Sequence, residues 1–256
     1  MRSYGKLKKK TIENDMKAIK KKRNSKFFKL TGNKIKKSVS LSKYKGWNNS
    51  MIAKFYFNSS TSIDRHFIRK QFPRIYNKEK IFIIISGNIK FYSHKVNLRL
   101  KKLDALSIFL DDFDYSFKCK KNSQLYIVGS EKLKKQKQKS KYFNFKKDIK
   151  PIDIWGGRCL SRPYCGKKLN VVLFDLKKGF KFNDKGHSNE QITWLISGSM
   201  NFYSGKLKNK LTTQTGIDIG HLHKHGGVSN GAVGFDAFFP KRIEKKYKNI
   251  AKVKNF

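Results

Sequence analysis

The chain has 256 residues, and 60 Lys and Arg stand against 17 Asp and Glu, which gives a formal net charge of +43. Hydrophobic residues make up 38% of the sequence, enough to bury a core, so the charge does not by itself indicate disorder. No apolar run approaches the roughly 18 to 20 residues of a membrane-spanning helix, and no apolar segment follows the Lys-rich start. We therefore expect no membrane span, no signal peptide and a cytoplasmic location.

Composition also limits the classes of partner. The basic residues are 51 Lys but only 9 Arg, whereas phosphate recognition usually favours the bidentate fork of Arg. This skew is typical of a nucleotide bias toward Lys codons, so nucleic-acid binding is not expected as the primary function. Cys119, Cys159 and Cys165 form no CxxC pair, which argues against a disulfide scaffold or a zinc ribbon.

Two basic stretches are predicted to lie outside the folded units. Residues 1–45 carry seventeen Lys and Arg against Glu13 and Asp15, and we interpret them as a solvated basic extension. Within it, TIENDMKAIKKK from Thr11 to Lys22 predicts a short helix, because acids come early and lysines late. Residues 131–149 begin with EKLKKQKQKSK, which has no apolar periodicity and is predicted to be a linker.

Between these stretches lie short runs of alternating β-branched and aromatic residues, which predict strands joined by turns. The class is therefore all-β, because helical periodicity is nearly absent outside the extension. In chain order the predicted strands are 52–57, 80–87, 89–93, 96–100, 105–110, 124–129, 169–176, 191–198, 200–205 and 232–239.

An internal repeat links the two halves of the chain. The segments EKIFIIISGNIKFYSHK from Glu79 and EQITWLISGSMNFYSGK from Glu190 align without gaps over seventeen positions, of which nine are identical. The offset of 111 residues is the size of a domain, so the repeat indicates duplication of a whole β domain. The alternative is two unrelated strand–turn–strand hairpins that share ISG by convergence.

The second copy carries a spaced pattern of glycines and polar residues. Gly179, five residues, Lys185-Gly186-His187, three residues, Gln191, six residues and Gly198 match every spacing of the first motif of the cupin superfamily. Downstream, GIDIGHLHKHGG resembles the second cupin motif, which ends in a ligand His. The resemblance implies two tandem jelly-roll barrels in one chain.

The resemblance also divides the chain. It implies a first barrel over 46–130 and a second over 150–244, with the linker at 131–149 between them and a basic tail over 245–256. The segments NEQI and FFPKR are similar to the second half of metal-dependent two-domain cupin isomerases. An isomerase or lyase acting on a small polar carbonyl or carboxylate compound in the second barrel is therefore the implied function.

A cupin site holds one divalent metal, here iron, manganese, cobalt, nickel or zinc. The resemblance assigns His187, Gln191 and His225 as metal ligands, with Gln191 a neutral and weaker donor. Lys185 and Glu190 are the candidate catalytic residues, with Lys185 as a base or carboxylate anchor. If the strand continues through 185, 187 and 191, these side chains share one face, the barrel interior.

Two parts of the pattern leave alternatives open. His221 and His223 compete with His225 for the loop ligand. In the first copy, Arg74, Tyr76 and Lys80 stand where Lys185, His187 and Gln191 do, so no metal centre is expected there. We expect a filled structural barrel, and the alternative is an anion site.

Three functions remain as hypotheses. The favoured one is the metal-dependent enzyme, whose positive chain would concentrate a small anionic or polar substrate. The cupin resemblance is compatible with a homodimer, but the sequence does not determine the oligomeric state. The first alternative is a non-catalytic two-barrel protein that binds a sugar or small acid. The second is a regulatory or nucleic-acid-associated protein that uses residues 1–45.

Overall fold

The computed structural model describes residues 23–75, 78–109, 113–131, 139–154, 156–242 and 253–256. Nearly all of the regular structure in these ranges is β, as predicted, and they contain one helix, α2 (Arg65–Gln71). The helix predicted over 11–22 lies outside the described residues. Among the described residues no helix has the length and apolarity needed to cross a membrane.

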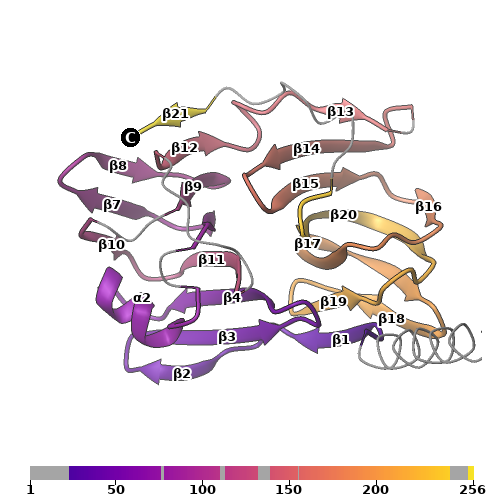
Figure 1. The fold of residues 1–256 in the computed structure, drawn as a ribbon, viewed down its shortest axis with the longest axis horizontal. Coiled ribbons are helices and arrows are strands. Elements are labelled where there is room, and N and C mark those ends of the chain that lie inside the picture. Colours follow the sequence, from indigo (N-terminus) through magenta and orange to yellow (C-terminus); the bar gives the residue numbers. More distant parts are fainter. Residues whose placement is uncertain (1–22, 76–77, 110–112, 132–138, 155, 243–252) are drawn as a thin grey trace, which may run out of the picture.

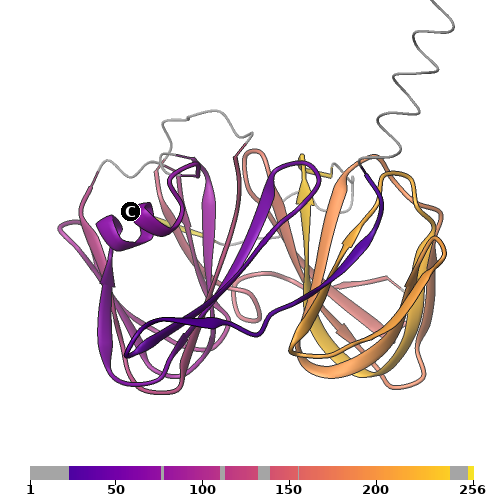
Figure 2. The same cartoon turned by 90° about the horizontal axis from the view of Figure 1, so that it is seen from below.

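The strands gather into two lobes, which lie side by side in Figures 1 and 2. In the first lobe, an eight-stranded sheet (order β2-β3-β4-β11-β6-β9-β12-β21) faces a four-stranded sheet (order β5-β10-β7-β8). The strands of this lobe are β2 (Asn33–Lys36), β3 (Val39–Lys45), β4 (Ser50–Phe57), β5 (Thr61–Asp64), β6 (Lys80–Ser86), β7 (Ile89–Ser93), β8 (Asn97–Leu100), β9 (Asp104–Ile108), β10 (Tyr115–Cys119), β11 (Ser123–Ser130), β12 (Lys141–Asn144) and β21 (Lys254–Asn255).

The second lobe is one nine-stranded sheet that bends back on itself. Its path runs β1-β19-β17-β20-β15-β14-β13, with β16 paired to β20 and β18 paired to β17. The strands are β1 (Lys26–Lys29), β13 (Ile152–Asp153), β14 (Cys159–Cys165), β15 (Asn170–Leu176), β16 (Lys181–Asp184), β17 (Glu190–Ser204), β18 (Leu207–Leu211), β19 (Thr215–Ile219) and β20 (His225–Phe239).

The two lobes repeat the same strand pairings. β6 and β7 of the first lobe correspond to the two halves of β17, and β11 and β10 correspond to the two halves of β20. The repeated ISG segment is therefore a bend at which one strand path continues. It is not the turn of a hairpin, which was the alternative interpretation of the repeat. At this bend Gly198 has φ +73°, and an added Cβ would lie 1.7 Å from the Gly231 carbonyl oxygen. Its counterpart Gly87 has φ +85°, so the bend requires glycine in both copies.

The boundaries expected from charge do not coincide with the structural ones. Residues 26–45, expected to be part of a solvated extension, form β1, β2 and β3. β1 pairs with β19 of the second lobe, whereas β12, inside the expected linker, pairs with β9 of the first lobe. Each lobe therefore takes one strand from the segment that precedes the other lobe. The prediction was wrong because it relied on the number of lysines. In β3 the lysine Lys43 is exposed while Val39 and Leu41 are buried, so a basic segment still forms a strand of the core.

The chain also returns to the first lobe at its end. β21 pairs with β12, and the ring of Phe256 lies 5.9 Å from that of Phe91 in the first-lobe core. The basic tail expected over 245–256 therefore ends in a paired strand and a packed aromatic side chain. Residues 243–252 lie outside the described ranges.

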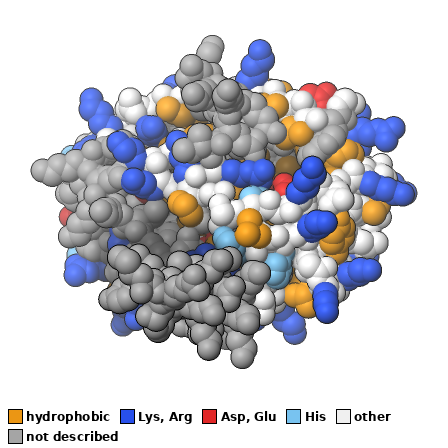
Figure 3. Space-filling view, turned by 45° about the vertical axis from the view of Figure 1, so that its right-hand side comes forward, with side chains coloured by type: hydrophobic (Ala, Val, Ile, Leu, Met, Phe, Trp, Pro, Cys, Tyr) orange, Lys and Arg blue, Asp and Glu red, His pale blue; other side chains and the backbone are white. Residues whose placement is uncertain are grey.

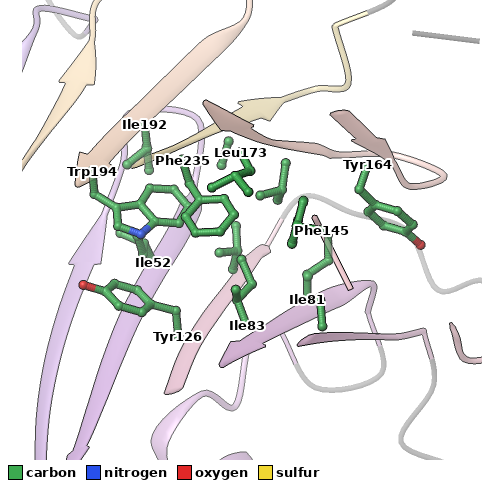
Figure 4. Close-up of a cluster of buried hydrophobic side chains, with 14 of the residues drawn as sticks. Ile52, Ile81, Ile83, Tyr126, Phe145, Tyr164, Leu173, Ile192, Trp194 and Phe235 are labelled. Carbon is green, nitrogen blue, oxygen red and sulfur yellow. The ribbon is translucent and has the colours of Figure 1, made fainter. Parts of the chain in front are cut away.

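The large sheets of the two lobes pack face to face through a shared hydrophobic core. Figure 4 shows Ile52, Ile83 and Tyr126 of the first lobe pointing toward Trp194 and Phe235 of the second. Trp194 is fully buried and stacks on Tyr126 and Phe235 at ring distances of 5.8 and 5.4 Å.

Equivalent glutamates bind the two lobes together. Glu79 accepts hydrogen bonds from the backbone N–H groups of Lys167 (2.9 Å) and Lys168 (2.8 Å), in the β14–β15 turn of the second lobe. Glu190 accepts one from Asn48 N–H (2.9 Å), in the β3–β4 turn of the first lobe. The first identity of the internal repeat is therefore explained by a reciprocal contact, in which each lobe caps a turn of the other.

Candidate metal centre

The second lobe encloses a cavity of about 200 Å³ between β15, β16, β17 and β20. In the first lobe the corresponding interior is filled by aromatic side chains. These are fully buried and contact one another at ring distances of 5.0 to 6.2 Å; they include Phe55, Phe57, Phe82, Phe91 and Phe117. Lys80, the counterpart of Gln191, is only 1% exposed, so it lies inside the first lobe as the alignment expects.

Three potential ligands converge at one end of this cavity. Asp184, His187 and His225 each offer one ligand atom, and these atoms all lie within 4.8 Å of one another. Asp184 ends β16 and pairs with His225, the first residue of β20, while His187 lies in the loop that leads to β17. Two imidazoles and a carboxylate form a donor set that suits a divalent transition metal.

Backbone carbonyls orient both imidazoles. His187 Nδ1 lies 3.0 Å from the Asn189 carbonyl oxygen, and His225 Nδ1 lies 3.0 Å from the His223 carbonyl oxygen. A carbonyl only accepts, so each Nδ1 carries the proton and each Nε2 keeps its lone pair. This is the arrangement in which protein imidazoles bind metals through Nε2.

Gln191 connects His187 to the half-buried carboxylate of Asp236. Its amide Nε2 donates to Asp236 Oδ1 (2.9 Å) and Thr193 Oγ1 (3.1 Å), and this directs its Oε1 toward His187 Nε2 at 2.8 Å. Thr193 Oγ1 also donates to Asp236 Oδ1 at 2.5 Å. In this orientation Gln191 presents its oxygen to the lone pair of His187, and a shared proton or a cation bound by both atoms would satisfy both.

The local electrostatics keep the cluster in the protonation state that metals need. Burial lowers the pKa of His187 and of His225, so both imidazoles stay neutral at pH 7. Burial would raise the pKa of Asp184, but the Gly186 N–H bond (2.8 Å) and the positive charge of nearby Arg242 lower it overall. Burial raises the pKa of Asp236 to about 6, against the opposing effect of its bonds from Thr193 and Gln191.

The structure corrects the expectation for Lys185. Its side chain is exposed, and Asp184 lines the cavity in its place. β16 ends at Asp184, and Gly186 has φ +93°, so no continuous strand carries the predicted alternation through 185 and 187. The sequence did contain a signal for Asp184, because Phe180, Phe182 and Asp184 alternate and all line the cavity.

Glu190, the other candidate catalytic residue, does not line the cavity. It is fully buried and directed at the first lobe, because it has the opposite parity to Gln191 on β17. Asp218 lies beside it and accepts bonds from Tyr44 Oη (3.0 Å) and Trp47 N–H (3.2 Å). Burial, together with the charge of Glu190, raises the pKa of Asp218 to about 8. Glu190 thus belongs to the interface between the lobes.

The three histidines that were alternatives for the loop ligand lie in different environments. His223 Nδ1 bonds to Ser25 Oγ at 2.9 Å, and His221 contacts the edge of Trp47 at a ring distance of 6.1 Å. Of these three histidines, His225 is the one that lines the cavity. Figure 3 shows several His side chains close together on one face, among hydrophobic and basic side chains.

Comparisons with known proteins bear on the fold. No protein-family model and no curated protein sequence matches the chain. Among solved structures, the protein Ylba from E. coli matches with a TM-score of 0.67 and 10% identity over 86% of this chain and 93% of that one. A cupin 2 conserved barrel domain protein from Leptotrichia buccalis matches with a TM-score of 0.59 and 14% identity over 84% and 96%.

An oxalate decarboxylase from Bacillus subtilis with Mn(II) centres matches with a TM-score of 0.63 and 9% identity over 85% of this chain and 78% of that one. At such low identities the likeness concerns the fold alone. The chain therefore has a cupin-type β fold, as the motif spacing predicted.

Proposed function

We propose that each lobe is a cupin barrel and that the second binds one divalent transition metal. On this proposal the protein is a metal-dependent isomerase or lyase of small carbonyl or carboxylate compounds. The matching strand pairings of the two lobes support the two-barrel interpretation. The enzyme whose fold is similar and which contains Mn(II) supports a metal in such a barrel.

The observation that carries the metal is the pair formed by His187 Nε2 and Gln191 Oε1 at 2.8 Å. Turning the Gln191 amide over would relieve it, but would place the amide oxygen at the position of Nε2, 2.9 Å from Asp236 Oδ1. That contact requires a protonated Asp236. A cation bound by His187, His225 and Asp184, with Gln191 as a neutral oxygen donor, satisfies the cluster with the carboxylates ionised.

The bound ion would supply Lewis acidity, which polarises a carbonyl and stabilises negative charge next to it. Residues of the chain itself would bind the substrate and accept its proton. Arg242 lines the cavity and offers a guanidinium to a carboxylate. Asp236, held by Thr193 and Gln191, is the carboxylate positioned to accept a proton from the substrate, and the apolar wall excludes water.

Metal content tests this function. We expect the full chain, purified at neutral pH, to contain close to one equivalent of transition metal by elemental analysis. His225→Ala should lose it, because one of the two imidazoles is removed, whereas His66→Ala, an exposed histidine on α2, should keep it. If wild-type protein takes up no Mn²⁺, Co²⁺ or Zn²⁺, or if His225→Ala takes them up equally well, the metal enzyme is excluded and a binding protein remains.

A further inference from the structure

The cavity of the second lobe has two ends of different chemistry, and the strand register orders them. Gln191 lies opposite Phe238, and Thr193 lies opposite Asp236 one step further along the sheet. On β15, Val172 lies opposite Asp236. Phe174, two residues further along the strand, is the first residue of the apolar part of the cavity. Four residues of strand span about 13 Å, so the change from polar to apolar takes place within the length of a small molecule.

The inner end is built from apolar side chains. Phe174 and Phe180 line it, and Phe202 lies between this end and His225, on which its ring stacks at 6.2 Å; all three phenylalanines are at most 5% exposed. The polar atoms there are weak partners, because Cys159 Sγ and Ser161 Oγ lie 3.7 Å apart and bond each other. A sugar hydroxyl placed at this end would lose its bonds to water and gain little in return, so a polyhydroxylated ligand is disfavoured.

The volume sets the size of the ligand. An apolar cavity of about 150 Å³ holds a benzene molecule. The cavity here is about 200 Å³, which leaves room for one ring or branched chain and a short polar head. A larger bicyclic or disaccharide ligand would not fit without movement of the walls.

The polar end carries a cation suited to an acid. Among the described residues that line the cavity, Arg242 is the only lysine or arginine. Its guanidinium lies 5.5 Å from the Phe238 ring, and its Nη1 lies 3.6 Å from Asp184 Oδ2. The planar fork of arginine matches a carboxylate, so the group most readily recognised here is an acid head beside the His187–His225 cluster.

We propose that the ligand of the second lobe is a small carboxylic acid with an apolar, ring-sized body. Its carboxylate binds Arg242, and its body packs on Phe174, Phe180 and Phe202. This inference rests on the proposed function for the reaction at the metal. The preference for the ligand itself depends only on the shape and chemistry of the cavity.

Calorimetric titration of the full chain tests the proposal with four probes: 3-phenylpropionate, 3-phenylpropan-1-ol, propionate and glucuronate. Each is titrated into chelator-treated protein and into protein reloaded with Mn²⁺. In both forms 3-phenylpropionate should bind at least tenfold more tightly than propionate, which lacks the body, and than glucuronate, whose body is polar. Equal or tighter binding of propionate or glucuronate would overturn the proposal.

Arg242→Gln tests the acid head. It should weaken 3-phenylpropionate binding at least tenfold and leave 3-phenylpropan-1-ol binding within twofold. Lys177→Gln, which removes an exposed positive charge from the same lobe, should change neither. If Arg242→Gln does not fold, Arg242→Lys retains the charge without the fork and should give an intermediate loss; an unchanged affinity in the folded variant would overturn the role of Arg242.

The two proposals fail separately. A protein that takes up no metal but keeps the preference for 3-phenylpropionate overturns the enzyme and retains the ligand class. A protein that binds Mn²⁺ but prefers glucuronate retains the metal site and overturns the ligand class.

Discussion

The two lobes share one set of strand pairings and differ in what fills them. The first interior is packed with phenylalanine rings and Lys80 is buried there, whereas the second holds a cavity with Gln191 at the same place in the repeat. The shared residues of the repeat serve the bend at Gly198 and the contact of Glu190 with the other lobe. The sheet framework therefore tolerates either interior, provided that the bends and the interface are kept.

Phe91 and Phe202 occupy the same position of the repeat and offer the strongest test of this difference. Phe91→Ala should lower the free energy of unfolding by about 3–5 kcal/mol, because a close-packed ring is removed. Phe202→Ala should cost about half as much, because Phe202 already borders a cavity. Urea unfolding of both variants measures the comparison, and equal losses would contradict it.

The interface glutamates should also differ. Glu79→Gln should destabilise the protein by about 1–3 kcal/mol, because both carboxylate oxygens accept backbone N–H bonds and an amide replaces one acceptor with a donor. Glu190→Gln should be close to neutral, because one oxygen can still accept from Asn48 while a charge beside Asp218 is removed. Thermal unfolding at pH 7 distinguishes them; a larger loss for Glu190→Gln would reverse the assignment.

Metal binding should remain confined to the second lobe. Asp184→Asn should weaken Mn²⁺ binding about tenfold, because a charged oxygen donor becomes neutral. Lys80→Gln, which gives the first lobe the Gln191 equivalent, should leave the stoichiometry at one ion per chain. Mn²⁺ titration followed by electron paramagnetic resonance measures both. A second site in Lys80→Gln would show that the aromatic filling does not exclude metal.

Asp218 should make stability depend on pH. Its pKa is raised from 3.8 to about 8, so the folded state keeps a proton that the unfolded state releases. Stability should therefore fall as the pH rises from about 4 through 8. Asp218→Asn removes this titration. The free energy of unfolding of the variant, relative to that of the wild type, should therefore rise by at least about 1 kcal/mol between pH 5 and pH 8.

The isosteric change is the suitable one, because an asparagine oxygen can still accept from Tyr44 and Trp47. Unfolding free energies at pH 5, 6, 7 and 8 give the two slopes. Parallel slopes would show that Asp218 does not hold the proton.

Much of the candidate site was predictable from local patterns. Motif spacing singled out His187, Gln191 and His225; in the structure Gln191 and His225 line the cavity, and His187 lies beside both of them. Parity on β17 separated Trp194, in the interface core, from Gln191 and Thr193, which line the cavity. Parity works there because β17 is regular over residues 190–195.

The error at Lys185 arose where regular structure stops. Lys185 was assigned inward because a strand was assumed through Gly186, where the backbone turns. Asp236 was visible only as the polar residue in AVGFDAFF, and Arg242 lies beyond the motif, after β20 has ended. Neither has a spacing rule that relates it to His187, so only the folded sheet brings them to the same cavity.

From the sequence alone follow the all-β class, the internal repeat and the spacing of His187, Gln191 and His225, because alternation and repeats are properties of the sequence itself. Only the tertiary structure decided that β1 and β12 pair with strands of the opposite lobes, that Glu190 faces the interface and that Asp184 joins the two imidazoles. These features depend on contacts between residues far apart in the chain. Their energies come from packing and burial, which no local pattern records.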